Sequence, residues 1–528
     1  FGESYAGGFF GPELKFAGFD AIFISGTSPE PVYILVREGK AELREAGHLW
    51  GKDVVETETI IRAECGQDAR IASIGPSGEK LSLISSIITA QGRAAARSGL
   101  GAVMGAKRLK AIAVQGQLEV PLADPSGLKE ARSKYLKQLG GNVKLWRDYG
   151  TCAVTLHAIQ SGDAPIKNWG GSVIDFPRAV AISHERVVEL QQRKFACWRC
   201  PVACGGVMKR GTGFYQYREG AHKPEYETLV AFGSLCLNSN LESIIMANDI
   251  CNRYGLDTIS TGATIAFAIE CYEKGLINKR DTGGIELQWG NHEAIVAMTK
   301  KIALREGLGD ILADGVKAAA ERIGKGAEEF AMHIHGQEVP MHDPKRYSFY
   351  AVTYLDATPA RHTQGSYGYR PAAGLEFPAY ERTTFAGRGK AHKMGSDLVH
   401  VVNCAGMCLY GYMFLNFEAI PRFLNLVTGR QFTLDDLLRI GERVANLRQA
   451  FNIREGVSLD NFKMPSRVIG QPPLGTGPLA GRRVELDVLL QDYLKARDWD
   501  LRTGKPSRNK LIELGLKDIA RVLWPGEC

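Results

Sequence analysis

Short apolar runs separated by turn residues dominate the first 120 residues, and this pattern predicts strands. The second and third runs flank Glu38-Gly39-Lys40, a spacing typical of a β-hairpin. A segment with helical periodicity, at about 53–65, interrupts the strands, and a proline-marked linker, 120–125, follows them. The chain is therefore predicted to begin with a β-rich domain. The predicted strands are 21–25, 32–36, 41–44, 69–74, 81–88 and 109–114.

From residue 125 onward, apolar side chains recur three and four positions apart, which predicts helices. The clearest helical segments are 241–254, 258–274, 292–306 and 310–323. After an irregular stretch that begins at residue 331, one helical face collects Ile440, Val444, Leu447 and Phe451. We therefore predict an α+β protein, in which a β-rich N-terminal domain, 1–121, precedes two mainly α-helical domains, 122–331 and 332–528.

Composition and charge narrow the class of protein. Apolar residues make up 45% and charged residues 23% of the 528 residues, which excludes a disordered or collagen-like chain. The net charge of +7 is mild, and we interpret the basic tract 107–110 as the solvated end of a strand, so no nucleic-acid partner is expected. No run of about 18 apolar residues occurs, so no membrane-spanning helix is predicted.

The cysteines carry the strongest local signal. They number eleven, and three of them fall within eight residues, which is typical of a metal site in a reducing compartment. Cys197, Cys200 and Cys204 have the spacing Cys-x2-Cys-x3-Cys, which suits three irons of a cubane cluster whose fourth iron takes a distant cysteine. Structural zinc is the alternative, although zinc usually requires a second pair of ligands. Cys404 and Cys408 are the candidates for the distant ligand.

Two further segments offer acid–base groups. Glu225 and Glu227 flank a tyrosine, so one of them could be a general base, or both could be acidic residues of a helix start. His362 lies in a polar stretch, where a histidine that titrates near neutral pH could exchange a proton with a substrate carbonyl or have a structural role only.

A short echo links two distant segments. Residues 252–257 have the pattern Asn-x-x-Gly-apolar-acid, residues 403–408 have Asn-x-x-Gly-apolar-Cys, and each closes a helical segment. Six-residue matches also arise by chance, so the echo alone leaves a shared role open. The glycine-rich stretch 99–105 lacks the spacing and context of a dinucleotide fingerprint, whereas the two arginines within 92–99 could bind phosphate groups.

Taken in order, these segments resemble the tungsten-containing aldehyde ferredoxin oxidoreductase family nearly from end to end. The cysteine triplet contributes to the resemblance together with 6–18, 73–79, 93–95, 101–105, 224–227, 254–262 and 406–408. The chain begins Phe1-Gly2-Glu3-Ser4 without an initiator Met, and the resemblance implies that an upstream part of the first domain is missing.

The resemblance implies three cofactors enclosed by the domains: a tungsten bis-pterin (with molybdenum as the alternative metal), a Mg²⁺ ion that bridges the pterin phosphates, and a [4Fe-4S] cluster. It assigns the cluster to Cys197, Cys200, Cys204 and Cys408, and the catalytic roles to Glu227 and His362. The pterin-binding residues that it implies are Gly7, Gly8, Arg93, Ala94, Asn252, Gly255, Leu256, Asp257, Asn403, Gly406 and Met407.

The implied function is oxidation of a small aldehyde to a carboxylic acid in the cytoplasm, with single electrons passed to ferredoxin or a ferredoxin-like iron–sulfur subunit. Glu227 would take a proton from water, and His362 would hydrogen-bond or protonate the carbonyl oxygen. Met246 and Asp249 replace a Glu-x-x-His found in one family branch, so a homo- or hetero-oligomer is expected to lack an iron between subunits. Asn252 and Asn403 stand where the family commonly has an acid.

Two alternatives remain open. One is a family relative that acts on another substrate, such as the catalytic subunit of an acyl-thioester or aromatic-ring reductase. The other is a non-catalytic iron–sulfur module. The presence of both Glu227 and His362 favours aldehyde oxidation over the other family activities. The content of tungsten and pterin would distinguish an enzyme of this family from a non-catalytic iron–sulfur module.

Overall fold

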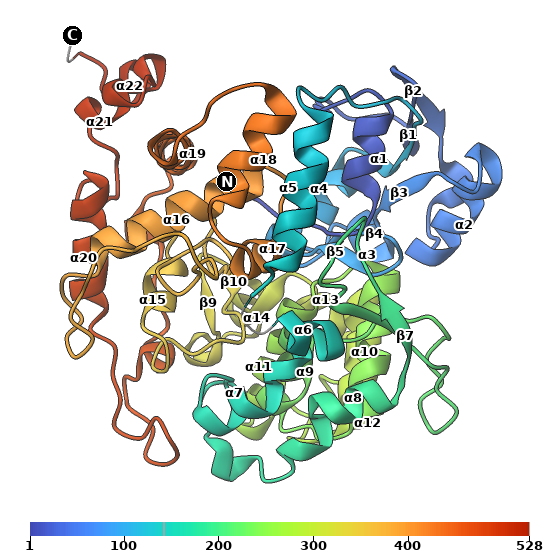
Figure 1. Cartoon of the computed structure of the whole chain (residues 1–528). Coiled ribbons are helices and arrows are strands. Elements are labelled where there is room, and N and C mark those ends of the chain that lie inside the picture. Colours follow the sequence, from blue (N-terminus) through green and yellow to red (C-terminus); the bar gives the residue numbers. More distant parts are fainter. Residues whose placement is uncertain (141–142, 527–528) are drawn as a thin grey trace.

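One six-stranded sheet organises the first region, residues 1–121 (Figure 1). The computed structural model describes residues 1–140 and 143–526, so Cys528 lies outside the described residues. The strand order is β2-β1-β6-β3-β4-β5, in which β1 and β6 are parallel and every other neighbouring pair is antiparallel. The strands are β1 (Val32–Arg37), β2 (Lys40–Glu45), β3 (Arg70–Ser73), β4 (Ile87–Thr89), β5 (Arg93–Ala95) and β6 (Leu109–Gln115).

Apolar side chains cover both faces of this sheet. On one face, Tyr33 and Leu35 of β1 pack with residues of α2 (Val54–Cys65). On the other face, Ile34 and Val36 pack with residues of α1 (Phe10–Phe16) and α4 (Leu100–Ala106). A sheet buried on both sides requires apolar side chains at consecutive positions, which explains the nearly continuous apolar runs of β1 and β6. A short helix, α3 (Pro76–Glu79), follows β3.

The second region is helical except for one β-hairpin (green in Figure 1). Strands β7 (Gln191–Phe195) and β8 (Gly205–Met208) pair antiparallel, and the loop between them carries the cysteine triplet. The helices are α5 (Pro125–Lys137), α6 (Val143–Tyr149), α7 (Thr155–Ser161), α8 (His184–Glu189), α9 (Tyr226–Phe232), α10 (Leu241–Tyr254), α11 (Thr258–Glu273), α12 (His292–Leu304), α13 (Leu308–Leu312) and α14 (Gly315–Ile323). Helix α11 is buried along most of its length and lies in the largest hydrophobic core.

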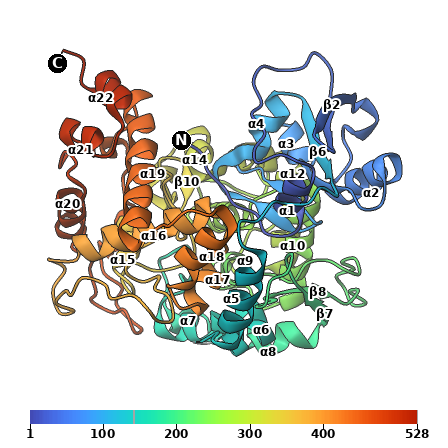
Figure 2. The same cartoon turned by 45° about the horizontal axis from the view of Figure 1, so that its top comes forward.

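The third region begins with long connections and ends in helices. Figure 2 shows it beside the first region, with the second region below both. A small two-stranded sheet, β9 (His333–Ile334) and β10 (Gln337–Glu338), lies at its start. Its helices are α15 (Phe349–Thr353), α16 (Gly389–Cys404), α17 (Leu409–Phe414), α18 (Ala419–Thr428), α19 (Leu434–Arg454), α20 (Leu486–Arg497), α21 (Arg508–Glu513) and α22 (Lys517–Leu523). Helix α5 packs on α18 through Ala131, Tyr135, Ala419 and Leu426, although α5 falls within the predicted second domain.

The structure confirms the α+β class and the order of a β-rich region followed by helical regions. The predicted hairpin is β1–β2, and the predicted helices at 53–65 and 241–254 are α2 and α10. None of the described helices combines the length and apolar character that a membrane span requires.

Several local predictions are wrong. Residues 21–25 form no strand, and Phe23 is 96% exposed. Within 81–88 only the end is extended, as β4, because the preceding serines bend the chain toward the second region. The helix predicted over 310–323 is broken into α13 and α14.

Two burial predictions also fail. On α19, Leu447 and Phe451 are exposed, whereas the polar side chains Arg448, Gln449 and Asn452 are buried. In the tract 107–110, Lys110 is fully buried because β6 lies inside the sheet rather than at its edge.

Candidate functional site

The centre of the site is the carboxylate of Glu227, in the first turn of α9. Its Oε2 accepts a hydrogen bond of 2.9 Å from the backbone N–H of Met341. Its Oε1 is buried without a hydrogen-bond partner, 3.5 Å from Nε2 of His342 and 3.6 Å from Nε2 of His362. One carboxylate oxygen therefore lies between two imidazole rings.

The two imidazoles have opposite electrostatic surroundings. Burial lowers the pKa of His362 well below its ordinary value, and the positive charges of His342, Arg97 and Arg361 add to this effect, so His362 is neutral. Burial would also lower the pKa of His342, but the charge and hydrogen bond of Asp163 and the charge of Glu227 raise it above its usual value. Burial raises the pKa of Glu227, and His342 partly offsets that rise.

Glu227 and His362 are predicted from the sequence as catalytic residues, whereas His342 and Asp163 are not. Nδ1 of His342 lies 2.8 Å from Oδ2 of Asp163, a residue of the loop that follows α7. Neither residue belongs to a motif with informative spacing. The only local signal is the dense run of polar and aromatic residues that begins at His342.

Tyrosines fix the two histidines from several elements. His342 is stacked between the rings of Tyr226 and Tyr350, with centroids 4.7 and 4.9 Å away. The hydroxyl of Tyr354 donates to the backbone oxygen of His342 at 2.7 Å, and that of Tyr369 donates to the backbone oxygen of His362 at 2.7 Å. Four tyrosines thus shape the surroundings of the two histidines.

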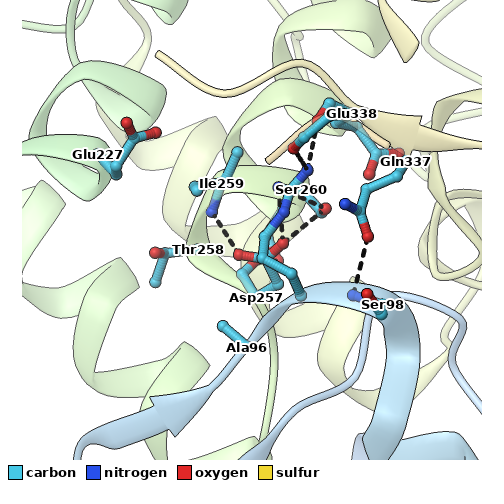
Figure 3. Close-up of polar contacts among 12 residues, drawn as sticks. Ala96, Ser98, Glu227, Asp257, Thr258, Ile259, Ser260, Gln337 and Glu338 are labelled. Atoms are coloured by element: carbon cyan, nitrogen blue, oxygen red, sulfur yellow. Dashed lines mark hydrogen bonds and ion pairs between the residues drawn. The ribbon is translucent and has the colours of Figure 1, made fainter. Parts of the chain in front are cut away.

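Arg97 joins the three regions next to Glu227. Its Nη1 donates to Oδ2 of Asp257 at 2.9 Å, and its Nη2 donates to the backbone oxygens of Glu338 and Ala360. Figure 3 shows Asp257, at the start of α11, with Ser260 beside it, and Glu338 and Gln337 above Ser98, which lies in the short 3-10 turn that follows β5. A cavity of about 570 Å³ adjoins this network, and its lining includes Ala96, Ser98, Asp257, Ser260, Glu338 and Thr358.

The cysteine loop of β7–β8 meets the N-terminal glycines. The backbone N–H of Trp198 donates to the oxygen of Gly8 at 3.0 Å. A Cβ atom on Gly7 would lie 2.8 Å from Sγ of Cys197, so only glycine allows this approach. The resemblance-derived residues Gly7 and Gly8 are therefore adjacent to the cysteine loop.

The four predicted cluster cysteines are free thiols within electrostatic reach of one another. Burial raises the pKa of Cys204 to about 12, and the charges of Glu225, Cys408 and Cys197 contribute to the rise. Cys408 is exposed at the surface of the site, yet the protein around it desolvates its thiol and raises its pKa, with contributions from Cys200 and Cys197. In residues 1–140 and 143–526, no three His, Cys, Asp or Glu side chains are close enough to hold a single metal ion.

Arg93 and Glu225 form an ion pair beside the cysteine thiols. Nη1 of Arg93 donates to Oε1 of Glu225 at 3.0 Å, and the charges of Glu225, Cys197 and Cys204 raise the pKa of this arginine although burial opposes the rise. Ala94 pairs with Ile88 in the sheet. Cys404, at the end of α16, instead has Glu3 and Arg448 as its charged neighbours.

The two echo segments share one helix-ending geometry. Leu256 N–H donates to the oxygen of Cys251, and Met407 N–H donates to that of Val402, each spanning five residues. Gly255 and Gly406 both have positive φ, +77° and +67°, as this termination requires. Asn252 is buried, and Asn403 has a buried Nδ2 atom without a hydrogen-bond partner.

Several buried polar atoms near the site lack a hydrogen-bond partner. Buried polar groups are normally satisfied, so such atoms point to a resident group that supplies their partners. This set fits a large polar cofactor next to an iron–sulfur cluster. It comprises Glu227 Oε1, Asn403 Nδ2, both amide atoms of Gln364, and the Nε atoms of Arg93 and Arg97.

Comparisons with known proteins cover nearly the whole chain. The aldehyde ferredoxin oxidoreductase N-terminal domain matches residues 1–116, and domains 2 and 3 of the same family match residues 127–516. The tungsten-containing aldehyde ferredoxin oxidoreductase of Pyrococcus furiosus is 37% identical over 525 residues, covering 97% of this chain and 84% of the relative. The Thermococcus kodakarensis protein of the same name is 37% identical over 527 residues, with the same coverage.

More distant relatives carry other names. The aliphatic sulfonate oxidoreductase, WOR-like subunit, of Pyrococcus furiosus is 28% identical over 540 residues, covering 97% of this chain and 82% of the relative. The solved active site complex BamBC of benzoyl coenzyme A reductase, in complex with 1,5-dienoyl-CoA, superposes with a TM-score of 0.78 at 26% identity. That match covers 98% of this chain and 84% of the solved one. These matches show that the chain belongs to the aldehyde ferredoxin oxidoreductase family of oxidoreductases.

Proposed function

We propose that the chain oxidises aldehydes to carboxylic acids as a tungstopterin enzyme and passes single electrons through a [4Fe-4S] cluster to ferredoxin or a ferredoxin-like subunit in the cytoplasm. The observation that carries the proposal is the buried Glu227 carboxylate, whose free Oε1 lies between the imidazoles of His342 and His362. The relatives with 37% identity, which are named as tungsten-containing aldehyde ferredoxin oxidoreductases, support this substrate class.

The cofactors are assigned to residues already described. Cys197, Cys200, Cys204 and Cys408 would hold the cluster, because a cubane accommodates thiols farther apart than the ligands of one zinc ion. When bound, the tungstopterin supplies the two-electron redox chemistry, and the cluster carries electrons away one at a time. The residues proposed to hold the pterins and the Mg²⁺ region are Gly7, Gly8, Arg93, Ala94, Asn252, Gly255, Leu256, Asp257, Asn403, Gly406 and Met407.

The side chains divide the proton chemistry between them. Oxidation of an aldehyde by water releases two electrons and two protons, so a base is needed. A carboxylate with a raised pKa is suited to that task, and Met341 N–H holds Glu227 so that Oε1 stays available. His362 is neutral, so it donates a hydrogen bond to the carbonyl oxygen rather than transferring a proton as an imidazolium.

Related activities define the alternative function. The sulfonate oxidoreductase and benzoyl-CoA reductase relatives match nearly the full chain, so a reductase or another oxidised substrate is the second candidate within the family. A non-catalytic iron–sulfur module is the third. In any oligomer, an iron between subunits is not expected at 246–249, where Asp249 is buried and paired with Arg218 at 3.0 Å.

Metal analysis and one substitution test the proposal. We expect about one tungsten and about four irons per chain. Glu227→Gln should reduce aldehyde-dependent viologen reduction at least ~100-fold while tungsten content is retained, because the general base is lost. Glu306→Gln, at an exposed helix end, is the matched control and should leave the rate unchanged. Iron without tungsten would favour the module, and undiminished activity of Glu227→Gln would refute the base assignment.

A further inference from the structure

His342 is held between two carboxylates and two tyrosine rings. Its Nδ1 lies 2.8 Å from Asp163, its Nε2 lies 3.5 Å from Glu227, and stacked tyrosine rings enclose both of its faces. The backbone oxygen of Asp163 accepts a hydrogen bond of 2.7 Å from Asp343 N–H, which ties the Asp163 loop to the segment that carries His342. The ring can neither flip nor tilt without breaking these contacts.

Asp163, a protonated His342 and Glu227 would give a row of three charges: negative, positive and negative. A neutral imidazole that donates from Nδ1 to Asp163 would present a lone pair on Nε2 to the carboxylate of Glu227, which is repulsive. A protonated imidazole carries an N–H on both nitrogens, so it can hydrogen-bond Asp163 and present positive charge to Glu227. The geometry therefore suits an imidazolium at His342 and a neutral imidazole at His362, on opposite sides of the same carboxylate oxygen.

We propose that Asp163 and His342 are positioning residues that keep a protonated imidazole beside Glu227, so that Glu227 remains ionised and acts as the base although it is buried. The activity part of this inference rests on the proposed function, whereas the ionisation of Glu227 does not. Asp163 acts through His342, and His342 acts through Glu227; neither needs to touch the substrate.

The charged surroundings support this assignment. The pKa of His342 is raised despite burial because Asp163 and Glu227 both favour its cation. The pKa of Glu227 is raised by burial, and His342 is the largest opposing influence. The titratable and charged groups around the two residues are Tyr226 of α9, Tyr350 of α15 with the neighbouring Tyr354, Tyr369, His362 and Arg361 of the following loop, Arg97 of the first region, and Asp163, Asp343 and Lys345.

Two substitutions remove the cation by different routes. His342→Gln keeps an amide donor but no charge, and Asp163→Asn removes the charge that keeps His342 protonated. Without the neighbouring cation, the ionised form of Glu227 is less stable, so the pKa of Glu227 rises. The acid limb of the pH–rate profile should then move to higher pH by about one unit. Asp163 also repels the carboxylate of Glu227 directly and weakly. The shift in the pKa of Glu227 should therefore be somewhat smaller in Asp163→Asn than in His342→Gln.

The test titrates the holoenzyme by infrared difference spectroscopy and by aldehyde-dependent viologen reduction. The C=O band of protonated Glu227 is identified by its absence in Glu227→Gln, and we expect its midpoint to rise by about one pH unit in both variants. The double variant should shift no further than His342→Gln, since both residues act on one charge. His292→Gln, which loses a remote histidine hydrogen-bonded to Tyr215 at 2.6 Å, should shift neither measurement.

The outcomes separate the two proposals. An unchanged midpoint of the Glu227 band in folded, tungsten-containing variants overturns the inference, and the near-isosteric Asp163→Asn decides the matter if His342→Gln does not fold. A shifted band with an unshifted acid limb of the rate profile would leave Asp163 and His342 as positioning residues. That result would remove Glu227 from the role of base.

Discussion

Lys110 shows how far one residue can depart from its sequence context. It lies in a basic tract, yet its side chain is 0% exposed and its Nζ donates to the backbone oxygen of Lys52 at 2.7 Å and to the carboxylate of Glu79. Burial lowers the pKa of Lys110, and Glu79 opposes this effect. The pair is stabilising only while both partners are present, because an unpaired buried charge is costly.

We therefore expect Glu79→Gln to destabilise the protein by about 3 kcal/mol, seen as a lower melting temperature of the holoenzyme. The double variant Glu79→Gln with Lys110→Met should recover most of this loss, since no charge then remains buried. If Glu79→Gln melts like the native protein, the pair does not contribute to stability.

The residues of the site divide into those that spacing marks and those that only the fold brings together. The cysteine triplet, Glu227 and His362 stand out because of their motifs and the family resemblance. Asp163 and His342 are single residues in ordinary segments, 179 positions apart, and become neighbours only through packing. No periodicity or spacing contains that information.

Among the elements, the end of α10 shows how a helix is fastened to the first region. The backbone N–H of Ser86 donates to the oxygen of Gly255 at 2.8 Å, and that of Asp257 donates to Ile84 at 2.9 Å. Gly75, which precedes α3, lies so close that a Cβ atom there would be 2.3 Å from the carbonyl of Tyr254. The echo segment 252–257 is therefore held in place by direct backbone contact.

Gly75→Ala should displace this contact and lower stability by roughly 1–3 kcal/mol, as overpacking against rigid backbone does. The proposed aldehyde oxidation should fall with it, because Asp257 and Arg97 would shift together. Gly11→Ala, in α1, has nothing within 4 Å of the new Cβ atom and should be neutral or slightly stabilising. Thermal melting and activity of the two variants, measured side by side, check the expectation; equal behaviour would contradict it.

Element prediction succeeded where one face of a segment meets a continuous core, as in α2 and α10. It failed for 21–25 and 81–88, which are apolar enough for strands but have no neighbouring strand along most of their length. On α19 the polar face is buried because it meets charged residues of other segments, an arrangement that hydrophobic spacing cannot reveal.

For the whole molecule, Glu3 links the N-terminal segment to the third region. Its Oε2 lies 2.7 Å from Nη2 of Arg448, and Nη1 of the same arginine lies 2.7 Å from Oδ1 of Asp356. Its backbone N–H donates to Oγ of Ser98 at 3.3 Å, and Arg361 donates to its backbone oxygen. Like Arg97, Glu3 therefore helps to join the first region to the third.

Glu3→Gln should loosen this junction without unfolding it, because Asp356 still pairs with Arg448. We expect faster amide hydrogen exchange in residues 1–8 and a stability loss of about 1–2 kcal/mol. Glu30→Gln, on the exposed surface of the first region, should change neither. Unaltered exchange in Glu3→Gln would mean that the backbone contacts alone hold the segment.

The strand order of the first region also bears on how the chain acquires its shape during synthesis. β1 and β2 can pair as soon as they leave the ribosome, and β3, β4 and β5 are likewise local neighbours. The strand that unites these halves, β6, is made last, and its pairing of Val32 with Leu109 closes a long loop. Non-local closure of this kind is slow, so the nascent edges of β1 and β3 remain open to wrong partners until translation has passed residue 115.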